Sequence, residues 1–311
     1  MQTNSPTSHS INLISLEKYF DEMVTLYESN IFPKVFLLNG QKGIGKFTLV
    51  MHFLNYIFTK NETTNYNVKN KLINIKSNFY NSILNHTCSH VIFLKAEEGK
   101  NIKIEDARNL KSNLSSSSLS KNERFIIIDD VEFLNTNSAN ALLKILEEPS
   151  TNNYFILINN QQADLMETIY SRCLPNNIYL TTIQKKNIVE YLLKKDKDIF
   201  IIEYDGFLSP GLYVNYNKLL CKYKIDITDD IKQKIYKLLY AFQKDKNNVL
   251  ISLSVFLIEQ YFYKLIKEEN AHIDFLIGLK SALVNKINYF ARYNLNIKSV
   301  LNFIELKLYN V

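Results

Sequence analysis

One short segment restricts the possible folds of this chain more than any other part of the sequence. The apolar run Lys34–Leu38 leads into a glycine-rich turn, and a helical pattern resumes over Leu49–Phe58. The turn contains three glycines and a lysine: Gly40, Gly43, Gly45 and Lys46. A buried strand, a turn and a helix in this order form the first unit of an α/β domain with a parallel sheet.

The turn also has the composition of a phosphate-binding loop. Glycines let backbone N–H groups converge on a phosphate, a helix N-terminus lies behind them, and Lys46 can reach the outer phosphates. The next residue is normally Ser or Thr, whose hydroxyl holds Mg²⁺. Phe47 takes that place here, and Thr48 comes one residue late, which turns its hydroxyl by about 100° around the helix. We expect no required cofactor and at most static ATP or ADP binding; a plain glycine-rich surface loop is the alternative.

A second motif lies about 80 residues further along the chain. The apolar segment Phe125–Ile128 is typical of a buried strand, and it runs directly into Asp129 and Asp130. In nucleotide-hydrolysing proteins with a phosphate loop, the acid at this strand end helps to hold Mg²⁺. An ordinary strand end with a solvated acidic turn would have the same sequence. The preceding glycine-rich turn favours the nucleotide site, so both acids join the candidate residues.

Two further motifs carry a resemblance to a known family. The first is the run NALLKILEEPS over Asn140–Ser150, and the second is Ser171–Cys173, which follows an intervening strand. Composition alone makes the first an amphipathic helix with a proline stop. Together they resemble the clamp-loader branch of the AAA+ proteins, from Ile31 to Cys173 and more weakly through Ser209–Gly211. The loop GQKGIGKFT is similar to the degenerate loop of the delta-prime members of that branch.

The resemblance implies a fold, a set of partners and one functional residue. The fold is an AAA+ P-loop α/β domain followed by a small helical lid and a helical collar. In this family the arginine of the Ser-Arg-Cys motif reaches the ATP of the neighbouring subunit, so Arg172 is expected to be an arginine finger in trans. The planar fork of a guanidinium can bridge phosphate oxygens; a surface salt bridge is the alternative.

The resemblance implies that the chain is a component of a DNA-directed DNA polymerase holoenzyme, and it implies the partners that such a component has. They are gamma/tau and delta subunits in a hetero-oligomeric ring, the sliding clamp, and primer–template DNA through the complex. The net charge of +6 permits contact with nucleic acid without requiring it. Three cysteines without a CxxC pair fit a reducing cytoplasm. The longest apolar stretch, Val249–Ile258, is shorter than the roughly 20 residues that span a bilayer, so no membrane contact is expected.

The chain departs from the ATPase-active gamma/tau subunits, which are the main alternative within the family. Phe47 lacks the hydroxyl, and Asp130 is one methylene shorter than the Glu usual there. Gly211 and Leu212 stand where the lid normally has an arginine, and Cys88 is alone in the interval where these subunits bind zinc with four cysteines. We therefore expect no zinc and little or no ATP hydrolysis. A clamp-loader-like ATPase of a recombination or repair pathway fits the two family motifs less well, and an unrelated signalling NTPase does not fit them.

The change of pattern along the chain predicts three domains. Residues 1–178 are expected to form the α/β domain, 179–225 the lid and 226–311 the collar, which would join the subunit to its neighbours. Residues 60–88 are rich in Asn and Lys. We expect them to form a surface insertion with little defined structure.

Overall fold

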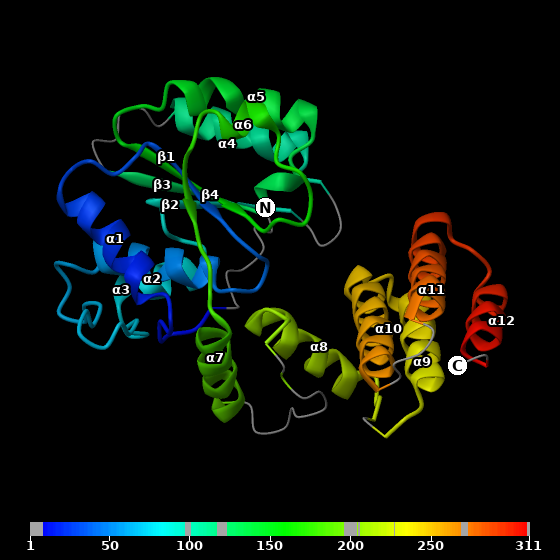
Figure 1. Ribbon diagram of the computed structural model, residues 1–311. Helices are drawn as coiled ribbons and strands as arrows, with labels where there is room; N and C mark the ends of the chain where they lie inside the picture. Colours follow the sequence, from blue (N-terminus) through cyan, green and yellow to red (C-terminus); the bar gives the residue numbers. More distant parts are fainter. Residues whose placement is uncertain are drawn as a thin grey trace. The chain divides into compact units, whose positions relative to one another are not determined.

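The computed structural model (Figure 1) describes residues 9–96, 101–116, 123–195, 204, 206–226, 228–268 and 273–309. The chain forms two compact units. One contains Met1–Lys195 with Tyr204–Leu212, and the other contains Asp196–Glu203 with Tyr213–Val311. The division falls inside helix α8 (Pro210–Lys222), whose first three residues belong to the first unit.

The first unit is built on a sheet of five strands in the order β2-β3-β4-β1-β5. In chain order the strands are β1 (Val35–Asn39), β2 (Val91–Lys95), β3 (Arg124–Asp129), β4 (Asn153–Asn159) and β5 (Leu174–Asn177). All neighbouring pairs run parallel. β3 lies inside the sheet between β2 and β4, and all its residues are buried. The parallel α/β domain predicted from the sequence is therefore confirmed.

Helices cover both faces of this sheet (Figure 1). On one face lie α1 (Glu17–Glu28), α2 (Lys46–Phe58) and α3 (Asn78–Leu84). On the other lie α4 (Ile104–Ser116), α5 (Thr136–Glu147) and the short α6 (Glu167–Tyr170). A 3-10 turn, η1 (Val131–Phe133), follows β3, and α7 (Thr182–Lys195) follows β5.

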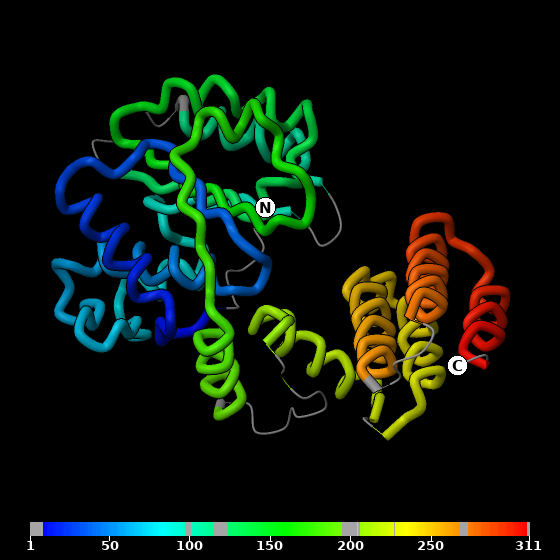
Figure 2. The backbone as a smooth tube through the Cα atoms, in the orientation of Figure 1, coloured from blue at the N-terminus to red at the C-terminus, as the bar shows by residue number. Residues whose placement is uncertain are grey.

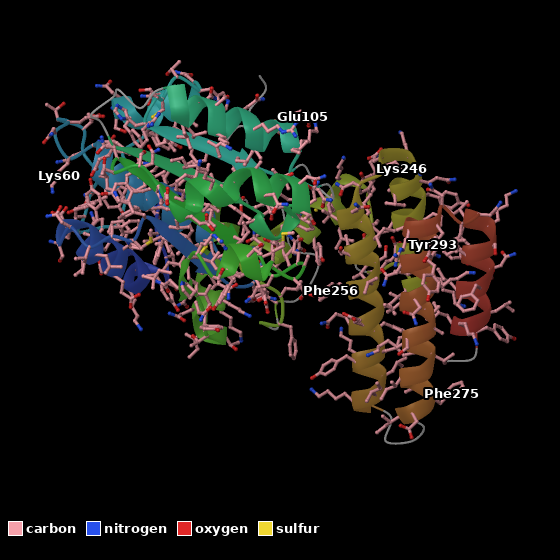
Figure 3. All side chains as sticks on the ribbon, turned by 90° about the horizontal axis from the view of Figure 1, so that it is seen from above. Lys60, Glu105, Lys246, Phe256, Phe275 and Tyr293 are labelled. Carbon is pink, nitrogen blue, oxygen red and sulfur yellow. The ribbon has the colours of Figure 1, made fainter. Side chains whose placement is uncertain are left out.

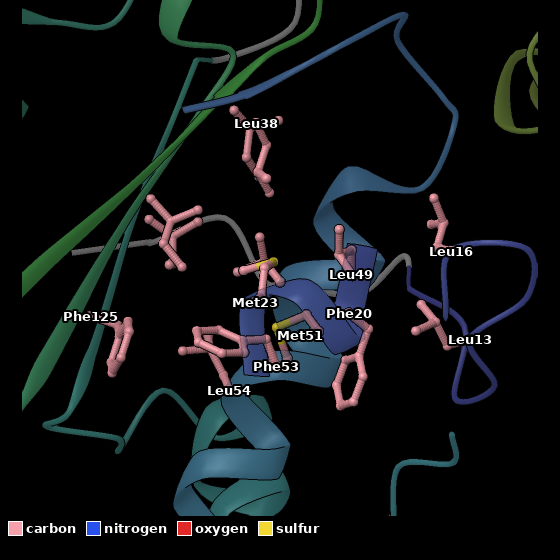
Figure 4. Close-up of a cluster of buried hydrophobic side chains, with 14 of the residues drawn as sticks. Leu13, Leu16, Phe20, Met23, Leu38, Leu49, Met51, Phe53, Leu54 and Phe125 are labelled. Atoms are coloured by element: carbon pink, nitrogen blue, oxygen red, sulfur yellow. The ribbon is translucent and has the colours of Figure 1, made fainter. Parts of the chain in front are cut away.

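Alternate residues of the strands supply two separate cores, because successive side chains of a strand point to opposite faces. Phe125 and Ile127 of β3 belong to the core beside α1–α3, whereas Ile126 and Ile128 belong to the core beside α4–α6. Figure 4 shows part of the first core, where side chains of α1 and α2 gather opposite Phe125. These cores hold the carboxyl ends of the strands, and the loops that follow them, in fixed positions.

The insertion at residues 60–88 has more structure than the sequence suggested. Ser77 caps α3, because its hydroxyl accepts a hydrogen bond from the Tyr80 backbone N–H at 3.1 Å. Phe79 and Ile83 are buried in the core beside α1–α3. A few apolar residues at helical spacing therefore anchor a segment whose overall composition is polar.

The second unit contains a bundle of four helices. They are α9 (Ile231–Asp245), α10 (Asn248–Glu268), α11 (Ile273–Tyr293) and α12 (Ile297–Leu308). α10 packs against α9 and α11, and α12 packs against the same two helices. Figure 2 traces the chain through the bundle, and Figure 3 shows α10 and α11 side by side, with Phe256 and Phe275 labelled.

The apolar stretch that ends at Ile258 is only part of the longer helix α10. Asn248–Lys267 is a 20-residue segment with a mean hydropathy of 1.5, and a third of its window is buried. Among the described residues this one helix meets the length and composition of a membrane span, a criterion that the core helix of a soluble bundle also meets. Leu250, Leu253 and Phe262 are fully buried.

Candidate functional site

The glycine-rich turn lies between β1 and α2, as predicted. β1 ends at Asn39, and α2 begins at Lys46 with Gly45 as its N-cap. Gly43 and Gly45 have φ angles of +84° and +100°. Residues other than glycine adopt such positive φ angles only at a cost in free energy. The turn therefore requires glycine at both positions, and it presents the N-terminus of α2 beside the carboxyl end of the sheet.

The side chain of Lys46 folds back onto its own loop. Its Nζ donates hydrogen bonds to the carbonyl oxygens of Gly40, at 2.6 Å, and Gln41, at 2.9 Å. The residue is 2% exposed. Burial lowers the pKa of Lys46 to about 8, although the nearby Asp129 carboxylate opposes the shift. The ammonium is thus engaged by backbone carbonyls of the loop that a phosphate would otherwise approach.

The two residues after Lys46 are placed as the sequence suggested. Phe47 packs at the edge of the core beside α1–α3, with its ring 5.8 Å from that of Phe93. Thr48 follows one position later on α2 and is half-buried. The position that normally supplies a Mg²⁺-binding hydroxyl therefore supplies an aromatic contact.

Asp129 lies at the end of β3 and is bound by protein groups on both oxygens. One carboxylate oxygen lies 2.9 Å from Nζ of Lys95, the residue opposite it at the end of β2. The other oxygen accepts hydrogen bonds from the Asn160 side chain, at 3.0 Å, and from the backbone N–H of Asp130. Lys95 and Asn160 thus occupy both carboxylate oxygens of Asp129, with which an acid at this position would orient hydrated Mg²⁺.

Asp130 is also engaged, and its backbone is unusual. Its φ of +59° is in the left-handed region. Its carboxylate accepts hydrogen bonds from the side chains of Asn160, at 2.8 Å, and Gln162, at 3.3 Å, and Nζ of Lys42 lies 3.9 Å away. Sequence reasoning missed Lys95 and Asn160. Lys95 is the last residue of β2, and Asn160 directly follows β4. Both strands neighbour β3, so the shared carboxyl end of a parallel sheet could have indicated these residues.

A third acid, Glu132, closes this polar cluster. It is buried in η1, and its carboxylate accepts hydrogen bonds from the backbone N–H groups of Asn160 and Gln162. Burial raises its pKa, although those hydrogen bonds oppose the shift. Among the described residues, no group of three or more His, Cys, Asp or Glu side chains is arranged to hold a metal ion.

The start of α8 covers the outer side of the phosphate loop. The backbone N–H of Gly211 donates to the Gly43 carbonyl at 2.8 Å, and Ser209 is fully buried. A Cβ added to Gly43 would lie 2.5 Å from Ser209 Oγ and 3.0 Å from the Leu212 nitrogen. A Cβ added to Gly211 would lie 2.9 Å from the Gly43 carbonyl oxygen. This contact, which we call the glycine clasp, holds the Ser-Pro-Gly segment against the loop.

Arg172 lies on the surface after α6, and side chains and carbonyls hold its guanidinium. Its Nε donates to Glu147 Oε1 at 2.9 Å, and Nη2 forms an ion pair with the same oxygen. Nη1 donates to the Thr168 carbonyl at 2.6 Å and lies 3.3 Å from Ser171 Oγ. Glu147, Ser171 and Arg172 line a surface cavity of about 370 Å³ together with Leu146.

The neighbouring cysteine fixes the backbone at this position. Cys173 Sγ donates to the Ile169 carbonyl at 3.1 Å, and burial raises the pKa of its thiol to about 12. The thiol therefore stays protonated at neutral pH and anchors the segment. Its chemistry gives no sign of a nucleophile.

Arg172 and the phosphate loop lie at opposite ends of two neighbouring strands, β5 and β1. Phe36 of β1 pairs with Leu174 of β5, and Asn39 pairs with Asn177. Arg172 precedes the first of these pairs, and Gly40 follows the last. The paired section alone spans about 10 Å at roughly 3.3 Å per residue. The structure therefore brings together the loop and the two acids, and it places Arg172 apart from them.

The strand order, the glycine-rich loop after β1 and the acids at the end of β3 define the fold of an AAA+ P-loop protein. The family model described as "DNA polymerase III, delta subunit" matches residues 16–182. That is more than half of the chain, so the chain belongs to this family. The resemblance to the delta-prime clamp-loader branch, which the sequence motifs indicated, is confirmed at the level of the family.

Individual relatives agree with this assignment. A DNA polymerase III subunit delta' from Buchnera aphidicola subsp. Baizongia pistaciae is 28% identical over 166 residues, which are 51% of this chain and 47% of that protein. The delta' of Buchnera aphidicola subsp. Schizaphis graminum is 26% identical over 238 residues, 75% of this chain and 67% of that protein. A gamma subunit from Buchnera aphidicola subsp. Acyrthosiphon pisum is 28% identical over 161 residues, 51% of this chain and 42% of that protein. The chain thus spans between 42% and 67% of the length of these curated relatives.

Proposed function

We propose that this chain is the delta-prime subunit of a DNA polymerase III clamp loader and supplies Arg172 to the ATP site of a neighbouring subunit. The observation that supports this most directly is the position of Arg172 at the amino end of β5, whereas the chain's own phosphate loop follows the carboxyl end of the neighbouring β1. The paired section of β1 and β5 separates a guanidinium at that end from the chain's own phosphate loop. The Arg172 side chain is partly exposed, so an adjacent subunit can bring a triphosphate to it.

The chain's own loop does not fit a catalytic Mg²⁺–nucleotide complex. Lys46 is engaged by the loop carbonyls, Asp129 is paired with Lys95, and Phe47 offers no hydroxyl. We infer little or no ATP hydrolysis by this chain and no requirement for zinc. Static binding of ATP or ADP would require Lys46 to release the carbonyls of Gly40 and Gln41.

The partners follow from the same proposal. They are gamma/tau and delta subunits in a hetero-oligomeric ring in the bacterial cytoplasm, the sliding clamp, and primer–template DNA through the complex. The collar would be the bundle of α9–α12. Two thirds of the apolar window of α10 is not buried within the chain, and Tyr263 on this helix is half exposed. We infer that helices of neighbouring subunits cover this surface, rather than lipid.

The alternative is an ATPase-active gamma/tau subunit, which the gamma relative supports over a similar share of the chain. Steady-state ATP hydrolysis by the isolated chain distinguishes the two. Our proposal predicts background turnover that Lys46→Ala leaves unchanged, together with co-purification of the chain with gamma/tau and delta subunits. Robust turnover that Lys46→Ala abolishes would favour the gamma/tau alternative.

A further inference from the structure

The contact between Glu147 and Arg172 joins two motifs that are 25 residues apart in the sequence. Glu147 is the last residue of α5, at the end of the Leu-Glu-Glu-Pro run, and Arg172 follows α6. Both Nε and Nη2 of Arg172 bind the same oxygen of Glu147. The C-terminus of α5 adds a partial negative charge beside the guanidinium.

We propose that Glu147 is a positioning residue that holds the Arg172 guanidinium in the orientation needed to meet a phosphate. This proposal rests on the function proposed above, in which Arg172 acts in trans. Glu147 itself would touch neither nucleotide nor phosphate. It would act through Arg172, by keeping a long and flexible side chain ordered before the neighbouring subunit arrives.

The hydrogen bonds of the guanidinium support this orientation. A guanidinium has five N–H groups in a planar fork. The Nε–H and one Nη2–H bind Glu147, and one Nη1–H binds the Thr168 carbonyl at 2.6 Å. The remaining contact, from Nη1 to Ser171 Oγ, is the longest at 3.3 Å. A phosphate that displaces it would meet one N–H from each of Nη1 and Nη2, which is the bidentate geometry that arginine favours.

The exposure of the pair argues against a mainly structural role. The side chains of Arg172 and Glu147 are 27% and 47% exposed, and ion pairs of this kind contribute little to the stability of a fold. Cys173 and the backbone hydrogen bonds of α6 already anchor the segment. Loss of Glu147 should therefore disorder the Arg172 side chain and leave the chain folded.

A double-mutant cycle in the reconstituted complex tests the proposal. The complex contains this chain with its gamma/tau and delta partners, and the measured quantity is kcat for ATP in the presence of clamp and primed DNA. Glu147→Ala should lower kcat by about fivefold, a factor that corresponds to roughly 1 kcal/mol for such a pair. Glu147→Gln retains an oxygen acceptor and should recover most of that loss. Glu148→Ala, which removes the adjacent exposed carboxylate, is the matched control and should leave kcat unchanged.

The decisive comparison is made in the background of Arg172→Ala. There, Glu147→Ala should have no further effect, and the thermal midpoint and assembly of each variant should match the wild-type chain. The positioning role is overturned if Glu147→Ala lowers kcat equally in the wild-type and Arg172→Ala backgrounds, or if it leaves kcat unchanged in the wild-type background. It is also overturned if Glu147→Gln lowers kcat as much as Glu147→Ala does. If Arg172→Ala alone leaves kcat unchanged, the proposed function fails as well, so the two failures are distinguishable.

Discussion

The glycine clasp predicts a large loss of stability on substitution of Gly43 by alanine. Gly43 has a φ of +84°, and its added Cβ would lie 2.5 Å from Ser209 Oγ. A residue other than glycine in the left-handed region costs about 1–2 kcal/mol, and overpacking of a tight contact costs about 1–3 kcal/mol. The sum is a loss of ~2–5 kcal/mol, or roughly 4–20 °C in the unfolding midpoint of a unit of this size.

Thermal unfolding followed by far-UV circular dichroism measures this midpoint, with Gly278 as the control and Gly211, the other half of the clasp, as a second test. Gly278 is on α11, and a Cβ there meets nothing within 4 Å. Gly278→Ala should therefore raise stability by up to about 1 kcal/mol through helix propensity. Gly211→Ala should lower it, because the new Cβ would lie 2.9 Å from the Gly43 carbonyl oxygen. A Gly43→Ala chain that unfolds at the wild-type temperature would refute the clasp.

Three further predictions concern the core, the loop lysine and the collar. Phe125→Ala should cost about 3–5 kcal/mol, measured by urea unfolding, because Phe125 is fully buried and stacks 5.1 Å from Tyr154. Lys46→Met should stabilise the chain below pH 8 and lose that advantage toward pH 10.5. Between these two pH values the unfolded chain binds more protons at Lys46 than the folded chain does, so the stability of the wild-type chain rises with pH. Urea unfolding midpoints of both chains at pH 7 and pH 10 test the sign. Truncation after residue 225 removes α9–α12 and should abolish co-purification with the partner subunits while the sheet domain stays soluble; full assembly of the truncated chain would contradict the collar.

Local patterns predicted much of the fold. The unbroken apolar run Phe125–Ile128 indicated an interior parallel strand, because such strands are buried on both faces. The glycines around Lys46 indicated the turn, because the backbone there needs conformations that other residues avoid. In both cases the physical cause lies within a few neighbouring residues, so the sequence pattern reports it directly.

Contacts between distant segments could not be read from the sequence. The pairs Asp129–Lys95 and Gly43–Gly211 depend on how strands and helices are brought together by the whole sheet. Helix α10 continues past the apolar stretch that ends at Ile258, because Glu259 and Gln260 interrupt the stretch without ending the helix. Arg172 was identified through a family motif, and the register of β5 against β1 shows that it lies at the strand end opposite the phosphate loop.

Whether Arg172 acts in trans is measured by ATP turnover of the reconstituted complex that carries Arg172→Ala. Arginine fingers contribute about 10³–10⁵ to turnover in well-studied GTPases, and a loader with several ATP sites should lose less in total. We predict normal assembly, a clear fall in clamp- and DNA-stimulated ATPase and in clamp loading, and poor rescue by Arg172→Lys, because a single ammonium lacks the planar fork. Unchanged turnover in a correctly assembled Arg172→Ala complex would rule out an arginine finger and leave Arg172 as a surface partner of Glu147.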